Sequence, residues 1–164
     1  MDKRTIRTHI IIPQKNLIIG NKIKTILKFK NTGKKDIRIY MIENEAFRAG
    51  QSTLFIIEKN TEKLMDMSPS PRPHGYIVTE KDFHLLKPGE EISFEQTIKI
   101  DEAKIKDPGE YILKWTYEND TVKWPGGIKT LDGLTKKLFG GGNIPDIYLG
   151  KIEKKANIII EKSA

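Results

Sequence analysis

The chain has 164 residues, of which 37% are hydrophobic and 31% charged, the size and balance of one globular domain spanning residues 1–164. No apolar run approaches the roughly 20 residues that span a bilayer, and the first residues lack the apolar stretch of a signal peptide. The absence of cysteine excludes disulfides, thiolate metal sites and cysteine nucleophiles. We expect a cytoplasmic protein if Met1 is the native start, or an exported one if a signal segment was removed.

Lysine carries most of the formal charge of +7. Arginine occurs only at positions 4, 7, 38, 48 and 72. Because arginine is the residue that pairs bidentately with phosphates and base edges, a basic chain with so little of it argues against a nucleic-acid partner. We expect a protein partner, either a different protein or a second copy of this chain.

The first part of the chain alternates apolar and polar residues in several places. Residues 4–12, 22–30 and 37–41 have a period of two, which predicts three strands. Residues 16–21 are predicted as a connector and residues 31–35 as a turn.

The predicted strand at 22–30 has two distinct faces. One parity carries the core candidates Ile23, Thr25, Leu27 and Phe29, and the other carries Lys22, Lys24, Lys28 and Lys30. The lysine row predicts a solvated sheet face whose charges are compensated by carboxylates on an adjacent strand. The alternative is a surface for an acidic partner.

Residues 52–58 are apolar on both parities, through Leu54, Phe55, Ile56 and Ile57. This pattern predicts a strand buried more deeply than its neighbours, joined to residues 63–67 as a hairpin. Residues 68–75 contain three prolines and are predicted as a loop, followed by a single helical turn at 79–83.

Two Pro-Gly turns each precede a strand with clean alternation. The turn in 86–91 leads into Ile92, Phe94, Gln96, Ile98 and Ile100 on one parity. After a crossover at 101–106, the turn at Pro108-Gly109 leads into a strand with Tyr111, Leu113, Trp115 and Tyr117 on one face. The last strands are predicted within 147–161, with 157–160 paired inside a sheet.

Residues 118–146 form a long excursion between two strands. Leu131, Leu134 and Leu138 stand at helical spacing before Gly140, which predicts a short amphipathic helix within 130–139. The segment is too apolar for a plain solvent loop, so its helix either covers one end of the core or displays an apolar patch to a partner. Its candidate partner-binding residues are Trp124, Leu131, Leu134, Leu138 and Phe139.

Together these elements predict an all-β fold, an antiparallel immunoglobulin-like β-sandwich of about seven to nine strands with a helix-containing insertion at 118–146. The two strands that follow the Pro-Gly turns, at 92–100 and 111–117, resemble the E and F strands of immunoglobulin-like and fibronectin-type sandwiches. That resemblance implies a tyrosine corner, in which the Tyr111 hydroxyl bonds to backbone within 104–107. More loosely, residues 23–117 resemble the immunoglobulin-like accessory domain of deuterolysin-like metallopeptidases and the intracellular proteinase inhibitor family.

The sequence shows no pattern that carries catalysis or a cofactor. His9, His74 and His84 lack the spacing of a zinc protease. The run Phe139-Gly-Gly-Gly-Asn143 follows the predicted helix and precedes no Lys-Ser or Lys-Thr pair, which favours a connector over a phosphate loop. We therefore expect a chain without catalytic, metal or cofactor residues.

Three hypotheses for function remain. The first is a non-enzymatic, immunoglobulin-like binding domain that uses the excursion and the loop at 68–75. The second is a proteinase inhibitor that places one of these loops in a protease cleft. The third is an enzyme whose site is assembled from residues without a recognisable motif.

Overall fold

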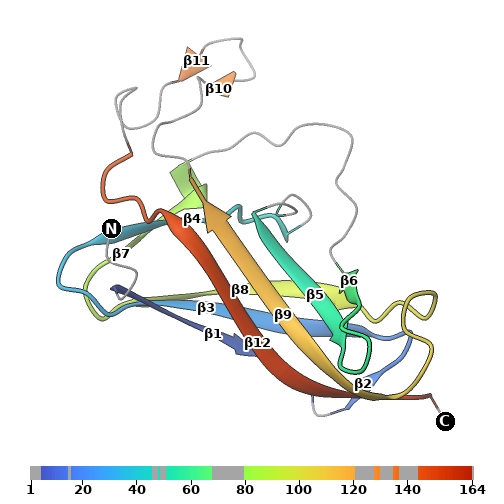
Figure 1. Cartoon of the computed structure of the whole chain (residues 1–164). Coiled ribbons are helices and arrows are strands. Elements are labelled where there is room, and N and C mark those ends of the chain that lie inside the picture. Colours follow the sequence, from blue (N-terminus) through green and yellow to red (C-terminus); the bar gives the residue numbers. More distant parts are fainter. Residues whose placement is uncertain are drawn as a thin grey trace.

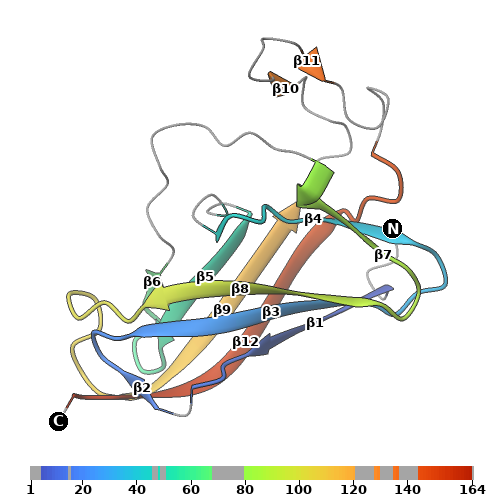
Figure 2. The same cartoon turned by 180° about the vertical axis from the view of Figure 1, so that it is seen from behind.

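The computed structural model describes residues 5–14, 16–45, 48, 51–67, 80–120, 128–129, 135–136 and 144–163. This part of the chain is all-β, and most of its strands pair antiparallel, as the alternating patterns predict. The 3-10 turn η3 (Glu80–Asp82) lies at the place where a helical turn is predicted. The two larger sheets lie one behind the other (Figure 1) and exchange places in the reverse view (Figure 2).

The first sheet has three antiparallel strands in the order β1–β3–β8. These are β1 (Ile6–Ile11), β3 (Lys22–Asn31) and β8 (Glu91–Lys99). The inward residues of β3 and β8 are buried, namely Ile23, Thr25, Leu27, Phe29, Phe94, Gln96 and Ile98. The predicted parities of both strands are confirmed.

The second sheet has five strands in the order β2–β12–β9–β5–β6. They are β2 (Leu17–Ile18), β12 (Gly150–Glu161), β9 (Gly109–Asn119), β5 (Ser52–Glu58) and β6 (Leu64–Asp66). β9 lies between β12 and β5, and β5 forms the predicted hairpin with β6. The prediction of a plain connector at 16–21 is wrong at β2, which pairs parallel with the end of β12 and is too short to show a period.

A small third sheet pairs β4 (Ile37–Tyr40) with β7 (Phe83–Leu86). The sequence does not predict β7, because its four residues stand between two turns and show no alternation. Since β4 follows β3 and β7 precedes β8, this sheet continues the β3–β8 pair beyond a turn in each chain segment.

Asn31 holds the two turns together. Its side chain is buried, and its Nδ2 donates to the carbonyl oxygens of Lys35 (2.8 Å) and Leu86 (2.9 Å). Its Oδ1 accepts from the N–H of Gly33 (2.9 Å), and its own N–H donates to the carbonyl of Glu90 (2.9 Å). The asparagine of the predicted turn therefore joins the end of β3 to the start of β8.

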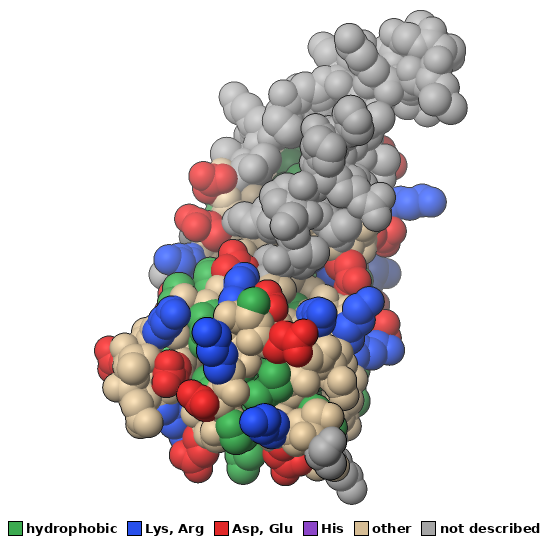
Figure 3. Space-filling view, turned by 90° about the vertical axis from the view of Figure 1, so that its right-hand side faces the viewer, with side chains coloured by type: hydrophobic (Ala, Val, Ile, Leu, Met, Phe, Trp, Pro, Cys, Tyr) green, Lys and Arg blue, Asp and Glu red, His purple; other side chains and the backbone are tan. Residues whose placement is uncertain are grey.

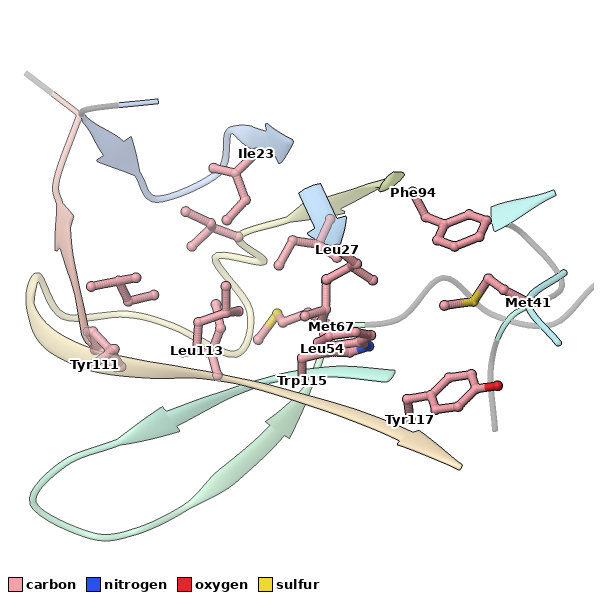
Figure 4. Packing of buried hydrophobic residues seen from close by; sticks show 14 of the residues in the cluster. Ile23, Leu27, Met41, Leu54, Met67, Phe94, Tyr111, Leu113, Trp115 and Tyr117 are labelled. Atoms are coloured by element: carbon pink, nitrogen blue, oxygen red, sulfur yellow. The ribbon is translucent and has the colours of Figure 1, made fainter. Parts of the chain in front are cut away.

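Aromatic side chains form the contact between the two large sheets. β9 points Tyr111, Leu113, Trp115 and Tyr117 into the core (Figure 4). From the other sheet, the ring of Phe29 lies edge-on to Trp115 (centroids 5.3 Å apart) and to Tyr117 (5.2 Å). Such pairs contribute about 0.5–1.5 kcal/mol each beyond area burial.

The polar atoms of these aromatic residues have partners. Trp115 Nε1 donates to Ser52 Oγ (2.9 Å), and the Tyr117 hydroxyl donates to the carbonyl of Tyr40 (2.7 Å). Burial, with smaller contributions from Tyr148 and Tyr40, raises the pKa of Tyr117 above its ordinary value. The hydroxyl therefore remains a neutral donor, and no buried phenolate forms.

The predicted hydrogen bond of the tyrosine corner is confirmed. The hydroxyl of Tyr111 donates to the carbonyl oxygen of Asp107 at 2.6 Å. Burial, followed by the charges of Glu58 and Asp107, raises the pKa of Tyr111, so its hydroxyl keeps the proton that it donates. The bond fixes the segment that leads from the crossover into β9.

The predicted helix in the excursion is corrected by the residues that the structure describes there. β10 (Ile128–Lys129) pairs antiparallel with β11 (Thr135–Lys136), so the helix predicted over 130–139 is wrong at Thr135–Lys136. Leu131, Leu134 and Leu138, whose spacing suggests the helix, lie outside the described residues. The sequence holds a hairpin signal between these strands, Asp132-Gly133.

The end of the excursion belongs to a second, small core. Ile144 and Ile147 are buried with Phe83, and Tyr40 and Leu149 pack against them. The rings of Tyr40 and Phe83 are stacked, with centroids 4.6 Å apart. Where it is described, this end of the excursion covers apolar surface of β4 and β7.

We expect Tyr111→Phe to lower the free energy of unfolding by about 1 kcal/mol, because it removes one part-buried hydrogen bond. Urea denaturation measures the change. Tyr40→Phe is the matched control, since its hydroxyl makes no hydrogen bond to the described residues. Equal midpoints for Tyr111→Phe and the wild type would show that the corner bond does not stabilise the fold.

Asn31→Ala should cost more, about 3 kcal/mol, because it leaves two carbonyl oxygens and one N–H without a partner in a buried turn. The same denaturation experiment applies, with the exposed Asn16→Ala as control. A cost for Asn31→Ala no larger than that of Asn16→Ala would contradict the role given to this side chain.

Candidate interaction surfaces

The predicted partner-binding residues Trp124, Leu131, Leu134, Leu138 and Phe139 all lie outside the described residues. The hypothesis that they bind a partner therefore stays a prediction. The described surface offers other candidates, and we take them in turn.

The histidines do not form a site in the described part of the chain. His9 is exposed on β1, and His84 Nε2 lies 2.9 Å from the carbonyl oxygen of Met41 with its ring against Phe94. His74 lies outside the described residues. No group of three or more metal-ligating side chains occurs among the residues that are described.

The lysine row of β3 lies on the outer face of the three-stranded sheet and is partly neutralised there. Lys24 pairs with Glu95 (2.8 Å) and Lys28 with Glu91 (3.3 Å), both on the adjacent β8. The predicted compensation by carboxylates is confirmed. This face is a solvated, mixed-charge surface, which weakens the case for an acidic partner.

The outer edge of β8 is covered by side chains from the loop after β4. The N–H of Thr97 donates to a carboxylate oxygen of Glu45 (3.0 Å), and the carbonyl of Glu95 accepts from the Arg48 guanidinium (2.9 Å). These are backbone groups that an added strand would need. Glu45 and Arg48 therefore oppose edge-to-edge pairing at this strand.

Arg48 is a residue that sequence reasoning missed. It is only 3% exposed, and its guanidinium also donates to the carbonyl oxygens of Ile42 and Glu43. The guanidinium carbon lies 5.4 Å from the centroid of the Phe94 ring, within range of a cation–π interaction. A buried cation is tolerated when its donors are hydrogen-bonded in this way. No pattern in the sequence indicates that Arg48 is buried.

The side chain of Gln14 likewise binds backbone groups of β3, beyond the point where β1 ends. With its amide oriented to satisfy both groups, Gln14 donates to the carbonyl of Lys24 and accepts from its N–H, each at 3.0 Å. The side chain takes the place of a strand residue after β1 has ended at Ile11.

The outer face of the five-stranded sheet differs from these covered edges, because it carries apolar side chains. Leu64, Ile57 and Ile112 stand side by side on β6, β5 and β9. Phe55 follows on β5, and Ile159 lies on β12 opposite Glu110. Leu64 is 50% exposed and Ile159 62% exposed, while the others are partly exposed. We call this surface the outer face.

The outer face explains the unusual pattern of β5. Leu54 and Ile56 are buried in the core, whereas Phe55 and Ile57 point to the outer face and are only partly buried. The strand is buried more deeply than its neighbours β6 and β9, as predicted, because none of its residues is exposed, although its second side is only partly buried. The run of apolar residues instead marks a second apolar surface, which Figure 1 views from the front with no described strand lying over it.

Charged residues of both signs border this apolar surface. Lys59 pairs with Glu110 (3.3 Å), and Lys114 pairs with Glu153 (3.5 Å). Lys155 lies directly opposite Lys114 in the β12–β9 register. Figure 3 views the molecule from the right-hand side of Figure 1 and not onto the outer face, and there too hydrophobic side chains stand between basic and acidic ones.

A cleft of about 340 Å³ lies between β1 and β12. Its lining includes Arg7 and Thr8 of β1 and Tyr148, Lys151 and Lys154 near or on β12. The cations would attract an acidic group, but they are exposed side chains at the mouth of an open cleft. The outer face is the better defined surface, because strand pairing fixes which of its side chains are neighbours.

No protein-family model matches the chain, and no curated protein matches it. Among solved structures, the chain is similar to the sporulation control protein Spo0M from Bacillus subtilis, at 14% identity and a TM-score of 0.43 over 98% of this chain and 50% of that one. It is also similar to a beta-glucosidase from Listeria innocua, at 8% identity and a TM-score of 0.38 over 96% of this chain and 16% of that one. The chain thus spans half the length of the first structure. Among the described residues, no helix is long and apolar enough to cross a membrane.

Ile112→Ala and Leu113→Ala test which side of β9 is exposed. Leu113 is fully buried, so its truncation should cost about 2–5 kcal/mol of unfolding free energy, whereas Ile112→Ala should cost less than about 1.5 kcal/mol. Denaturation at low protein concentration measures both. Equal costs would mean that the outer face is covered in the folded protein.

Proposed function

We propose that this chain is a non-enzymatic protein-interaction domain of immunoglobulin-like β-sandwich architecture, and that it binds its partner through the outer face. The strand order supports the architecture. In immunoglobulin-like domains, strands A, B and E lie in one sheet and C, F and G in the other. Here β1, β3 and β8 form one sheet, and β5, β9 and β12 are neighbours in the second.

The hydrogen bond from Tyr111 supports the same assignment, because it stands at the start of the strand equivalent to F. Two features differ from the antibody pattern. The chain has no cysteine, and its core Trp115 lies on β9, the equivalent of F, while in antibody domains the tryptophan lies on C.

The observation that carries the function is the apolar outer face. Antiparallel sheets that face water on one side usually carry polar side chains there. In this chain the solvent side carries Phe55, Ile57, Leu64, Ile112 and Ile159 within a border of charges. An apolar surface with a polar border is the anatomy of a protein interface.

The inhibitor hypothesis depends on loops at 68–75 and 118–146, most of which lie outside the described residues. It remains a prediction that a panel of serine and metallo-proteases would test.

A photo-crosslinking amino acid placed at Ile112, on the outer face, tests the interaction function in cells that express the full chain. We expect a crosslinked protein adduct that disappears when Ile57→Lys is added to the same chain. The matched position is the exposed Thr97, on the outside of the three-stranded sheet. No adduct at Ile112, or equal adducts at both positions, would contradict the proposed function.

A further inference from the structure

Strand register arranges the outer face in rows. One row contains Asn157, Ile112, Ile57 and Leu64, on β12, β9, β5 and β6 in that order. The next row contains Lys155, Lys114, Phe55 and Asp66. On the other side of the first row, Ile159 stands opposite Glu110, and the ion pair places Lys59 beside Glu110.

The rows are self-complementary when a second copy of the sheet is turned over and placed on the first. The strand order of the second copy then runs in the opposite direction. A two-fold axis that runs parallel to the strands between β5 and β9 exchanges β9 with the partner's β5 and β12 with the partner's β6. Each residue then faces the residue of the same row on the exchanged strand, and every contact occurs twice, as in any isologous interface.

Four of the facing pairs match in charge or polarity, whereas Asn157 meets the partner's Leu64 without such a match. Ile112 meets the partner's Ile57, and Lys155 meets the partner's Asp66. Glu110 meets the partner's Lys59. Lys114 lies over the partner's Phe55, the arrangement of a cation–π contact.

Other positions of the axis bring like charges together, although an axis centred on β5 also sets Lys114 against the partner's Asp66. An axis centred on β9 places Lys114 against the partner's Lys114 and Glu110 against the partner's Glu110. An axis centred on β5 places Lys59 against the partner's Lys59. Like charges brought together in this way cost affinity and disfavour a wrong register.

From this complementarity we infer that the outer face binds a second copy of this chain, as a face-to-face dimer about the axis between β5 and β9. This inference rests on the proposed function, for which it names the partner. In this arrangement the partner's Asp66 comes close to Lys155, which lies directly opposite Lys114 on the adjacent strand.

The size of the face sets the expected affinity. Three strands that each contribute about 20 Å of length and the three-residue β6, which contributes about 10 Å, lie about 4.8 Å apart and give roughly 340 Å² of sheet area. Standard interfaces bury about 800 Å² of accessible surface per partner, so this dimer is small. We expect it to form at micromolar to submillimolar concentration.

Charge exchange at Lys155 and Asp66 tests the inference in the full-length protein by sedimentation equilibrium. The wild type should self-associate, and Lys155→Asp alone or Asp66→Lys alone should weaken association at least about tenfold, since each creates two like-charge contacts per dimer. An equimolar mixture of the two variants should dimerise again, because each substituted side chain then meets its opposite charge. Lys99→Asp, which makes the same change on an exposed residue of β8, should leave association unchanged.

A wild type that stays monomeric up to about 1 mM, a concentration well above the expected dissociation constant, would overturn the inference. So would a mixture that associates no better than the separate variants. If the adduct from Ile112 contains a different protein and the wild type stays monomeric, the second copy is the wrong partner and the interaction function stands. If Ile112 gives no adduct at all, the interaction function itself fails.

Discussion

The contact of Phe29 with Trp115 and Tyr117 determines how the two large sheets of this protein lie against each other. The ring of Phe29 stands edge-on to both side chains, with centroid distances of 5.3 Å and 5.2 Å. Because side chains alternate along a strand, committing Trp115 and Tyr117 to the core commits Ile112, Lys114 and Thr116 to the other side of β9. The outer face is therefore a direct consequence of this core contact.

Backbone edges and the sheet face are treated differently in this fold. Glu45, Arg48 and Gln14 use their side chains to occupy backbone groups at the β8 edge and beyond the end of β1. Such groups would otherwise invite pairing with another strand. The outer face keeps apolar side chains in contact with water. These side chains thus oppose strand pairing at the edges, whereas nothing among the described residues covers the apolar outer face in the same way.

Much of the sheet architecture follows from the sequence, because a period of two directly reports which side of a strand is buried. The residues of β3, β8 and β9 show this period clearly, and the turn before β9 identifies Tyr111 as a hydrogen-bond donor. Two short strands, β2 and β7, have too few residues to show a period. In the excursion, the spacing of the leucines suggests a helix where Thr135–Lys136 pairs as a strand.

The candidate surface was only partly predictable. The apolar run in β5 is visible in the sequence, but it does not say whether the second side is buried or exposed. That distinction depends on β9 and β12, which are distant in sequence and bring Ile112 and Lys155 beside it. Arg48 gives no signal either, since its partners are carbonyl oxygens of Ile42, Glu43 and Glu95. Tertiary pairing supplies what local pattern cannot.

The most direct measurement of the outer face as an interface is an isotope-filtered NOE experiment on isoleucine methyl groups. Labelled and unlabelled full-length chains are mixed at a concentration where the dimer is populated. The structure predicts intermolecular NOEs between Ile112 of one chain and Ile57 of the other, and none from Ile26, which lies on the outside of the three-stranded sheet. Intermolecular NOEs confined to other isoleucines would contradict the account, as would their complete absence at high concentration.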